Sequence, residues 1–263
     1  MPNNITILFI ADIVGRVGRR LVSEKVEYLR KKFEIDFIIA NGENAAGGIG
    51  LTSDIAFQLF QNGVDVITSG NHIWEKKEIY PSLDREKRIL RPLNYPEQTI
   101  GHGFCVMERE GASIAVVNLE GRHFMRPVDC PFQALNRLIS SLKKQTNCVI
   151  VDFHAESTAE KQALANYFDG RVSAVLGTHT HVQTADEQIL PGGTAYITDV
   201  GMTGAYRSII GFDIPSSVSR FVSMMPVKLN PAKEDPRLQG VILSIDPQTG
   251  KGVRIQRLSL IKE

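Results

Sequence analysis

The chain lacks the features that mark secreted, membrane-spanning or nucleic-acid-binding proteins. Its 263 residues include three cysteines, Cys105, Cys130 and Cys148. Their odd number and wide spacing favour reduced thiols in a cytoplasmic protein over a disulfide framework. No apolar stretch approaches the roughly 18 residues that a membrane-spanning helix needs, and the first residues show no signal-peptide pattern. We therefore expect no membrane association.

An excess of charge of one sign is also absent. The sequence has 30 basic and 29 acidic residues, a net charge of +1, so no bulk attraction draws it to nucleic acid and no stable nucleic-acid binding is expected. The chain is long enough and, at 43% hydrophobic, apolar enough to bury a full core. Because no internal repeat or linker interrupts it, we expect a single domain over residues 1–263.

Five short apolar runs, typical of buried strands, each lead into polar residues that can bind a metal. The runs and the residues that follow them are 5–11 before Asp12, 37–40 before Glu43 and Asn44, 64–68 before Asn71 and His72, 149–153 before His154, and 172–176 before His179 and His181. Helical stretches, such as 52–61 and 130–144, separate some of the runs. This order predicts crossover connections and a largely parallel sheet.

Two further segments have the pattern of β-hairpins. Residues 103–108 and 113–119 flank Glu110-Gly111, and residues 240–245 and 253–260 flank a turn containing Gly250. A second section of sheet is therefore expected.

The polar residues at the ends of the five runs predict one metal site. Loops that leave the carboxyl ends of parallel strands converge on one crevice, so residues distant in sequence can meet there. The candidate ligands comprise two carboxylates, two amides and three imidazoles, a set that suits Mn, Fe, Zn or Co. Seven ligands exceed the need of one tetrahedral ion, which favours two ions that share a carboxylate.

Each candidate also has a structural interpretation when it is taken alone. Asp12 could cap the following helix, Glu43 and Asn44 could belong to a surface turn, and His154 could be a buried histidine with satisfied hydrogen bonds. His179 and His181 are one residue apart, so an extended segment would point both rings to the same side. The recurrence of such residues after strand-like runs favours the metal site.

The ordered motifs resemble those of calcineurin-like metallophosphoesterases and, more narrowly, of the YmdB-like bacterial phosphodiesterases. The motifs are Asp12-Ile13-Val14-Gly15, Gly42-Glu43-Asn44-Ala45-Ala46-Gly47-Gly48, Ser69-Gly70-Asn71-His72, His154 and Gly177-Thr178-His179-Thr180-His181. The similarity continues through residues 198–204 and beyond. Ordinary members begin with Asp-x-His and then carry Gly-Asp, whereas this chain has Val14 in place of that histidine and Glu43 in place of that aspartate.

This resemblance implies a fold and a ligand set. The fold would be an α/β architecture, a metallophosphoesterase-type four-layer α/β/β/α sandwich with two mixed sheets. One ion would be held by Asp12, Glu43, Asn44 and His181, and the other by Glu43, Asn71, His154 and His179. Replacing an imidazole with the amide oxygen of Asn44 hardens the first site, which favours iron or manganese over zinc.

The resemblance also implies an activity, a phosphodiesterase that converts cyclic nucleotides such as 2′,3′-cyclic AMP to the 3′-nucleotide. A hydroxide shared by the two metals would attack phosphorus, and His72 would protonate the leaving oxygen. The expected partner is a small phosphodiester, and the family's tendency to assemble makes a homo-oligomer an open prediction. Two alternatives stay open: a phosphomonoesterase acting on nucleotides or proteins, and a regulatory protein that binds metal and nucleotide with little turnover.

Residues that bind the substrate are not assigned. The segment 121–127 contains Arg122, His123, Phe124 and Arg126, in which the arginines could meet a phosphate or face solvent. Phe124 could stack on a base or fill a cap, and we favour the structural role. Arg16 is a weaker candidate for a phosphate contact.

Overall fold

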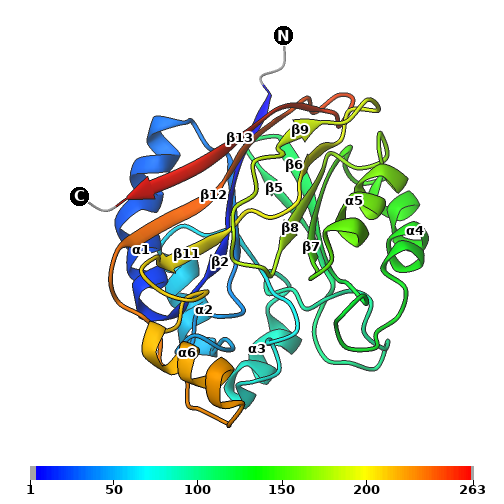
Figure 1. Cartoon of the computed structure of the whole chain (residues 1–263). Coiled ribbons are helices and arrows are strands. Elements are labelled where there is room, and N and C mark those ends of the chain that lie inside the picture. Colours follow the sequence, from blue (N-terminus) through cyan, green and yellow to red (C-terminus); the bar gives the residue numbers. More distant parts are fainter. Residues whose placement is uncertain (1–3, 262–263) are drawn as a thin grey trace.

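The computed structural model, which describes residues 4–261, has two β-sheets packed face to face between two layers of helices (Figure 1). The first sheet has the strand order β2 (Asp12–Ile13), β11 (Met202–Ala205), β12 (Pro236–Ile245), β1 (Ile5–Ile10), β3 (Phe37–Asn41) and β4 (Val66–Thr68), with β13 (Gly252–Ile261) paired to β12. The second has the order β5 (Phe104–Arg109), β6 (Ala112–Glu120), β7 (Cys148–His154), β8 (Ala174–Thr178), β10 (Ala195–Ile197) and β9 (Gln188–Ile189).

Both sheets are mixed. In the first, β1 runs parallel to β3 and antiparallel to β12. In the second, β6, β7, β8 and β10 are parallel, while β5 and β9 join at the two edges as antiparallel strands. The expected parallel strands are thus present, and the two predicted hairpins form β5 with β6 and β12 with β13.

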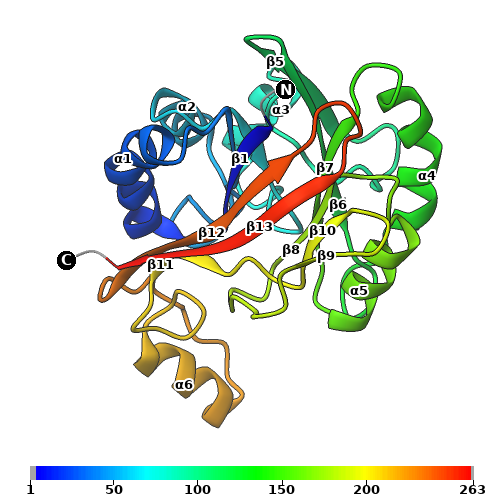
Figure 2. The same ribbon diagram turned by 90° about the horizontal axis from the view of Figure 1, so that it is seen from above.

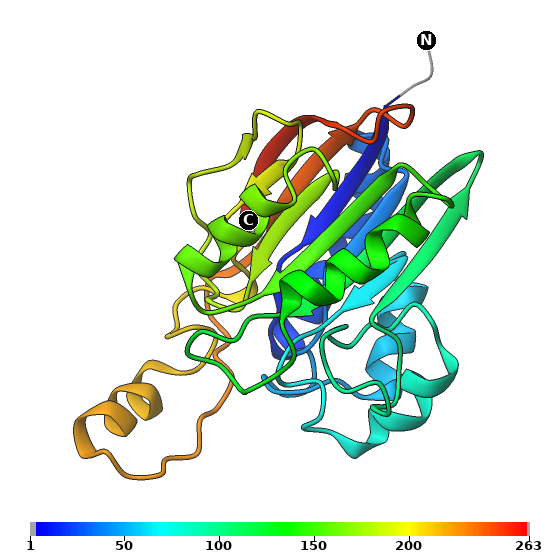
Figure 3. The ribbon, with the colours of Figure 1, turned by 90° about the vertical axis from the view of Figure 1, so that its right-hand side faces the viewer.

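Helices cover the outer face of each sheet (Figure 2). The helices are α1 (Gly15–Lys32), α2 (Ser53–Gln61), α3 (Tyr80–Arg85) and a 3₁₀ turn at Lys77–Ile79 on the first sheet, and α4 (Pro131–Leu142) and α5 (Thr158–Tyr167) on the second. A further helix, α6 (Ile214–Ser223), projects from the body of the molecule (Figure 3). The order of layers is therefore α/β/β/α, as the sequence resemblance implied.

Alternation along the strands explains how the layers adhere. In β1, Leu8 and Ile10 pack toward α1, whereas Ile7 and Phe9 point between the two sheets. Because successive residues of a strand face opposite sides, β1 contributes side chains both to the core under the helices and to the core between the sheets. Each fully buried side chain of this size contributes roughly 1.5–3 kcal/mol.

Two simpler expectations concern the cysteines and the membrane. Cys105, Cys130 and Cys148 are all unpaired. Among residues 4–261, no helix is both long and apolar enough to cross a membrane.

Candidate metal centre

The loops at the carboxyl ends of five strands bring all seven predicted ligands to one place between the sheets. His154 is the last residue of β7, and His179 follows β8 directly. Glu43 lies two residues beyond β3, Asn71 three beyond β4, and Asp12 opens β2 just after β1. The crevice expected from the order of the strands is therefore the place where these side chains meet.

Four of the seven side chains meet at one ring nitrogen, and we call this set the tight group. His154 Nε2 lies 3.1 Å from Glu43 Oε1, 3.0 Å from Asn71 Oδ1 and 3.1 Å from His179 Nδ1. One imidazole nitrogen can satisfy one hydrogen-bond partner, so three converging atoms exceed what a hydrogen bond explains. Ligands about 2.1 Å from an ion and at right angles to each other are about 3 Å apart, so this convergence fits a metal ion.

The other three side chains form a looser group beside Glu43. Asn44 Nδ2 lies 3.2 Å from both Glu43 Oε1 and His181 Nε2, and His181 Nε2 lies 3.8 Å from Asp12 Oδ1. Asp12 is fully buried, yet its Oδ1 has no hydrogen-bond partner among the described residues. An unpaired buried carboxylate oxygen is costly, and a cation would satisfy it. Rotating the side-chain amide of Asn44 by 180° would exchange its nitrogen for its oxygen at this position. The oxygen is the atom that was expected to bind the metal.

The charges of the site call for a cation. Burial raises the pKa of Asp12 well above its usual value. Burial alone would raise the pKa of Glu43 too, but the His154 imidazolium outweighs it and holds the pKa at about 2. Burial would lower the pKa of His154, but carboxylates, chiefly Glu43, raise it to about 9. His154 is therefore protonated near pH 7, and its positive charge lies beside the carboxylates. A metal ion bound to these carboxylates would supply that positive charge in place of the proton.

The two remaining imidazoles are in the form that binds metals. Burial, aided by the positive charge of His154, lowers the pKa of His179 to about 3, and burial also lowers the pKa of His181. Both rings are therefore neutral near pH 7, and neutral imidazole is the ligand form. His181 Nδ1 donates to the carbonyl of Ile210 at 3.0 Å, which leaves Nε2 free to bind an ion.

His179 and His181 do not lie in an extended segment, so the alternation considered from the sequence does not apply to them. β8 ends at Thr178, and the two histidines adopt φ angles of 101° and 64°, in the left-handed region. The turn is held by Thr180, whose backbone N–H and hydroxyl both donate to Asp199 Oδ2, at 3.0 and 2.8 Å. These bonds, rather than the alternation of a strand, set the direction of each ring.

A buried ion pair anchors this turn. Lys161 Nζ of α5 lies 2.8 Å from Asp199 Oδ2, and both side chains have no exposed surface. Asp199 Oδ1 accepts a further bond from the Gly201 amide. The sequence analysis missed both charged residues, because Lys161 lies in an otherwise ordinary helix and only the fold brings it to Asp199.

A second buried network orients His154 and Glu43. The hydroxyl of Thr178 lies 2.9 Å from His154 Nδ1 and donates to Asp152 Oδ1 at 2.7 Å. Asn41 donates to Asp152 Oδ2, and its own Oδ1 accepts the N–H of Glu43. Outer partners of this kind fix the ring that binds a metal. Asp152 was detectable in the sequence, since it precedes His154 by two residues and so shares its face of the strand.

Close packing at Gly70 supports the same ring. A β-carbon at this position would collide with the imidazole of His154, so only glycine lets the loop after β4 pass this close. The loop thereby presents Asn71 to His154.

His72, the predicted general acid, lies at the edge of the centre. Its backbone N–H donates to Glu43 Oε2 at 3.0 Å, while its side chain is 31% exposed and its Nδ1 lies 3.7 Å from Glu75 Oε1. Arg126 Nη2 lies 3.6 Å from the same Glu75 oxygen. The ring is thus partly exposed, and it lies beside Glu43 and next to the segment 121–127.

Arg16 was the weaker candidate for a phosphate contact. Arg16 lines a surface pocket together with Arg19, Arg20 and Lys233.

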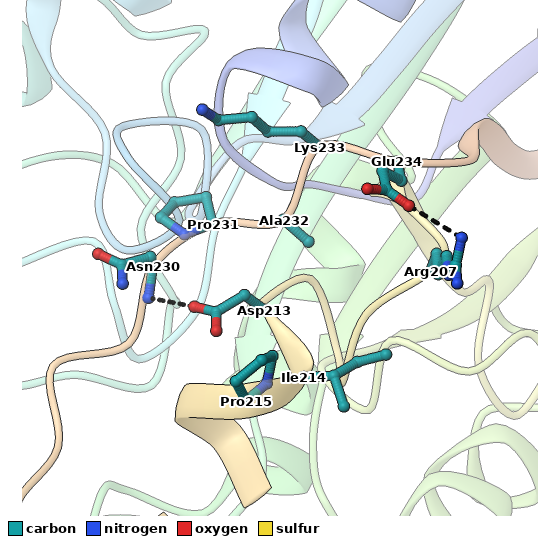
Figure 4. Close-up of a pocket in the computed structure, with 9 residues that line it drawn as sticks. All are labelled: Arg207, Asp213, Ile214, Pro215, Asn230, Pro231, Ala232, Lys233 and Glu234. Atoms are coloured by element: carbon teal, nitrogen blue, oxygen red, sulfur yellow. Dashed lines mark hydrogen bonds and ion pairs between the residues drawn. The ribbon is translucent and has the colours of Figure 1, made fainter. Parts of the chain in front are cut away.

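A pocket between the start of α6 and residues 230–234 is shown in Figure 4. It contains an ion pair between Arg207 and Glu234 at 3.1 Å. The backbone N–H of Asn230 also donates a hydrogen bond to the carboxylate of Asp213. Because none of the seven predicted ligands lines this pocket, it is separate from the metal centre.

Comparison with known proteins agrees with the fold and the motifs. The model of the family described as YmdB-like protein matches residues 8–258. A 2′,3′-cyclic-nucleotide 2′-phosphodiesterase of Bacillus subtilis (strain 168) is 51% identical over 252 residues, which cover 96% of each chain.

Two crystal structures have nearly the same fold. A hypothetical protein from Thermus thermophilus is 43% identical with a TM-score of 0.93, covering 98% of this chain and all of that one. A novel phosphatase from Mycoplasma pneumoniae is 36% identical with a TM-score of 0.93, covering 99% of this chain and 95% of that one. With its family model, its sequence identities and its fold in agreement, the chain belongs to the YmdB-like protein family of calcineurin-like metallophosphoesterases.

Proposed function

We propose that this protein is a metal-dependent phosphodiesterase that opens 2′,3′-cyclic nucleotides to 3′-nucleotides. The observation that carries the proposal is the convergence of Glu43, Asn71 and His179 on His154 Nε2. The substrate class rests on the 51% identity to the B. subtilis enzyme, whose name describes this activity. Metal ions are implied by the family as well as by the buried cluster of Glu43, His154 and His179.

The proposed centre holds two ions, with iron or manganese as the favoured metals. The tight group would hold one ion, the looser group of Asp12, Asn44 and His181 the other, and Glu43 would serve both because its Oε1 contacts members of each. When bound, such ions supply positive charge for the phosphoryl oxygens and lower the pKa of water. Amide and carboxylate oxygens among the donors make the site harder than an all-imidazole site.

His72 would act on the leaving oxygen. Formation of a 3′-nucleotide breaks the bond between phosphorus and the 2′ oxygen, which takes the electron pair and needs a proton. His72 is held beside Glu43 by its backbone and has a partly exposed side chain. Since Nδ1 points toward Glu75, Nε2 is the nitrogen that would deliver the proton.

A phosphomonoesterase is the second candidate, favoured by the similarity to the M. pneumoniae protein, which is described as a phosphatase. A binder with little turnover has less support, because it would have no need of a leaving-group acid, the role proposed for His72. The cytoplasmic location and any homo-oligomer stay predictions.

The experiment loads the purified protein with manganese or iron and follows 2′,3′-cyclic AMP by chromatography. We expect a 3′-nucleotide product that disappears in Glu43→Ala. Hydrolysis of 3′-AMP but not of the cyclic diester would select the phosphomonoesterase. Two bound metals without turnover of either compound would select the regulatory binder.

A further inference from the structure

We infer that Phe124 is the platform on which the nucleobase of the substrate stacks. The inference rests on the proposed function, and it assigns the base-binding side chain that the sequence left open. Four observations carry it: the exposure of Phe124, its backbone conformation, the anchoring of its loop, and the contacts that join this loop to the catalytic side chains.

The ring of Phe124 has no packing role. It is 82% exposed. Its ring lies against the ring of the neighbouring His123, with 4.1 Å between the two centroids. The structural role favoured from the sequence is therefore wrong. Exposing a large aromatic ring on an isolated turn contributes nothing to the core, whereas a free aromatic face is what a base stacks on.

The backbone of Phe124 is also strained. Its φ angle of 64° lies in the left-handed region, where a bulky residue without a local hydrogen-bonding side chain is rare. Glycine would occupy this conformation at no steric cost. A phenylalanine held there costs stability of the kind that proteins retain mainly at functional sites.

The loop that carries Phe124 is fixed to the metal centre at its base. The Gly121 amide donates to the carbonyl of His154 at 2.9 Å. A β-carbon at Gly121 would lie 2.6 Å from that of Ala155, so glycine permits this close approach. The amides of Arg122 and His123 donate to the carboxylate of Glu160, at 3.0 and 3.1 Å.

On the far side of Phe124, Met125 packs against the core beneath α4 and α5. Its neighbour Arg126 pairs with Glu75, the residue that approaches His72. Both flanks of Phe124 are thus held while its ring projects, which is the arrangement of a pre-organised contact rather than of a mobile loop.

Phe124 lies close along the chain to a residue that contacts the centre. It is three residues from Gly121, so their Cα atoms are at most about 11 Å apart, and Gly121 is hydrogen-bonded to His154 itself.

Stacking also predicts the kind of selectivity. An aromatic face accepts any base, because every base has a π-face, and it favours larger rings. We therefore expect purine cyclic nucleotides to bind more tightly than pyrimidine ones, without strict recognition of one base.

The test compares Phe124→Ala with Phe221→Ala, a matched variant on α6 whose phenylalanine is 73% exposed. Each is assayed on 2′,3′-cyclic AMP and on ribose 2′,3′-cyclic phosphate, which has no base. We expect Phe124→Ala to raise KM for the cyclic nucleotide about tenfold, with KM for the base-free ester unchanged. Phe221→Ala should have the KM values of the unmodified protein. Phe124→Trp, which keeps an aromatic ring at this position, should also keep the KM of the unmodified protein for the cyclic nucleotide.

A binding measurement separates this inference from the proposed function. The chain has one tryptophan, so Phe124→Trp adds a second fluorophore whose emission should be quenched by 3′-AMP. Phe221→Trp and the unmodified protein are the controls. Quenching confined to Phe124→Trp would support the platform even if the cyclic diester were not turned over. Equal KM values for Phe124→Ala and the unmodified protein on the cyclic nucleotide, or equal quenching at both sites, would overturn it.

Discussion

The two halves of the metal centre differ in how closely their side chains approach. In the tight group, three atoms lie within 3.1 Å of His154 Nε2, whereas in the looser group Asp12 and His181 are 3.8 Å apart. The tight half lies at the ends of β7 and β8 and is supported by Asp152 and Thr178. We therefore propose that the tight half is formed in advance and that an ion would draw the ligands of the looser half together.

The looser half is also the one that departs from the common pattern of the superfamily. Val14, buried directly after β2, stands where ordinary members carry an imidazole, and the carbonyl of Asn44 accepts the N–H of the next residue, Gly15, at 2.9 Å. A site in which an amide oxygen replaces an imidazole nitrogen should bind its ion less tightly.

The largest effect is expected from Glu43→Ala, which removes the side chain that touches both halves. Glu43 Oε1 lies 3.1 Å from His154 and 3.2 Å from Asn44, so the loss should lower bound metal from two ions per chain toward none. Turnover should fall by about 10³-fold or more. Elemental analysis and rates measure both quantities, with Glu43→Gln as the control that keeps an oxygen donor. Two ions and a normal rate in Glu43→Ala would show that the halves do not share this carboxylate.

His72→Ala should lower the rate without changing metal binding in either half of the centre. We expect full metal content, with kcat on 2′,3′-cyclic AMP lowered about 10²- to 10⁴-fold through loss of the general acid. A diester with a p-nitrophenol leaving group needs no protonation, so its rate should fall much less. An equal loss on the two substrates would contradict the proposed role.

Asp199→Asn should break the support of the turn that carries His179 and His181. It leaves Lys161 buried without its partner, which should lower the free energy of unfolding by about 3–5 kcal/mol. Denaturant titration measures this change. Glu234→Gln breaks the exposed pair with Arg207 and serves as the matched control, with an expected change of at most about 1 kcal/mol. Similar losses in the two variants would mean that burial of the pair does not matter.

Asp12→Ala should lower metal content less than Glu43→Ala, because Asp12 approaches His181 of the looser half and contacts the tight group only through the backbone N–H of His179. One ion per chain should remain, held by Glu43, Asn71, His154 and His179. Titration of the unmodified protein with a chelator should likewise remove the ions in two steps. Loss of both ions together, in the variant or in the titration, would show that the two halves bind as one.

The sequence predicted the parts of the site that follow from local pattern. Apolar runs before Asp12, His154 and His179 located the strand ends, because a buried strand has a recognisable composition and its end must face the crevice. The two hairpins were equally visible from their turns.

The supporting contacts could not be predicted, because they depend on tertiary neighbours. Lys161 and Asp199 lie 38 residues apart, and their pairing appears only when α5 packs beside the turn after β8. The left-handed conformations of His179 and His181 likewise follow from the bonds of Thr180 to Asp199. The spacing of the two histidines could not distinguish this turn from an extended segment.

The most direct test of the binuclear centre is anomalous diffraction from crystals grown with manganese. Two peaks are expected, one between Glu43, Asn71, His154 and His179 and a weaker one between Asp12, Glu43, Asn44 and His181. A single peak, or a peak away from these side chains, would contradict the assignment of the two halves.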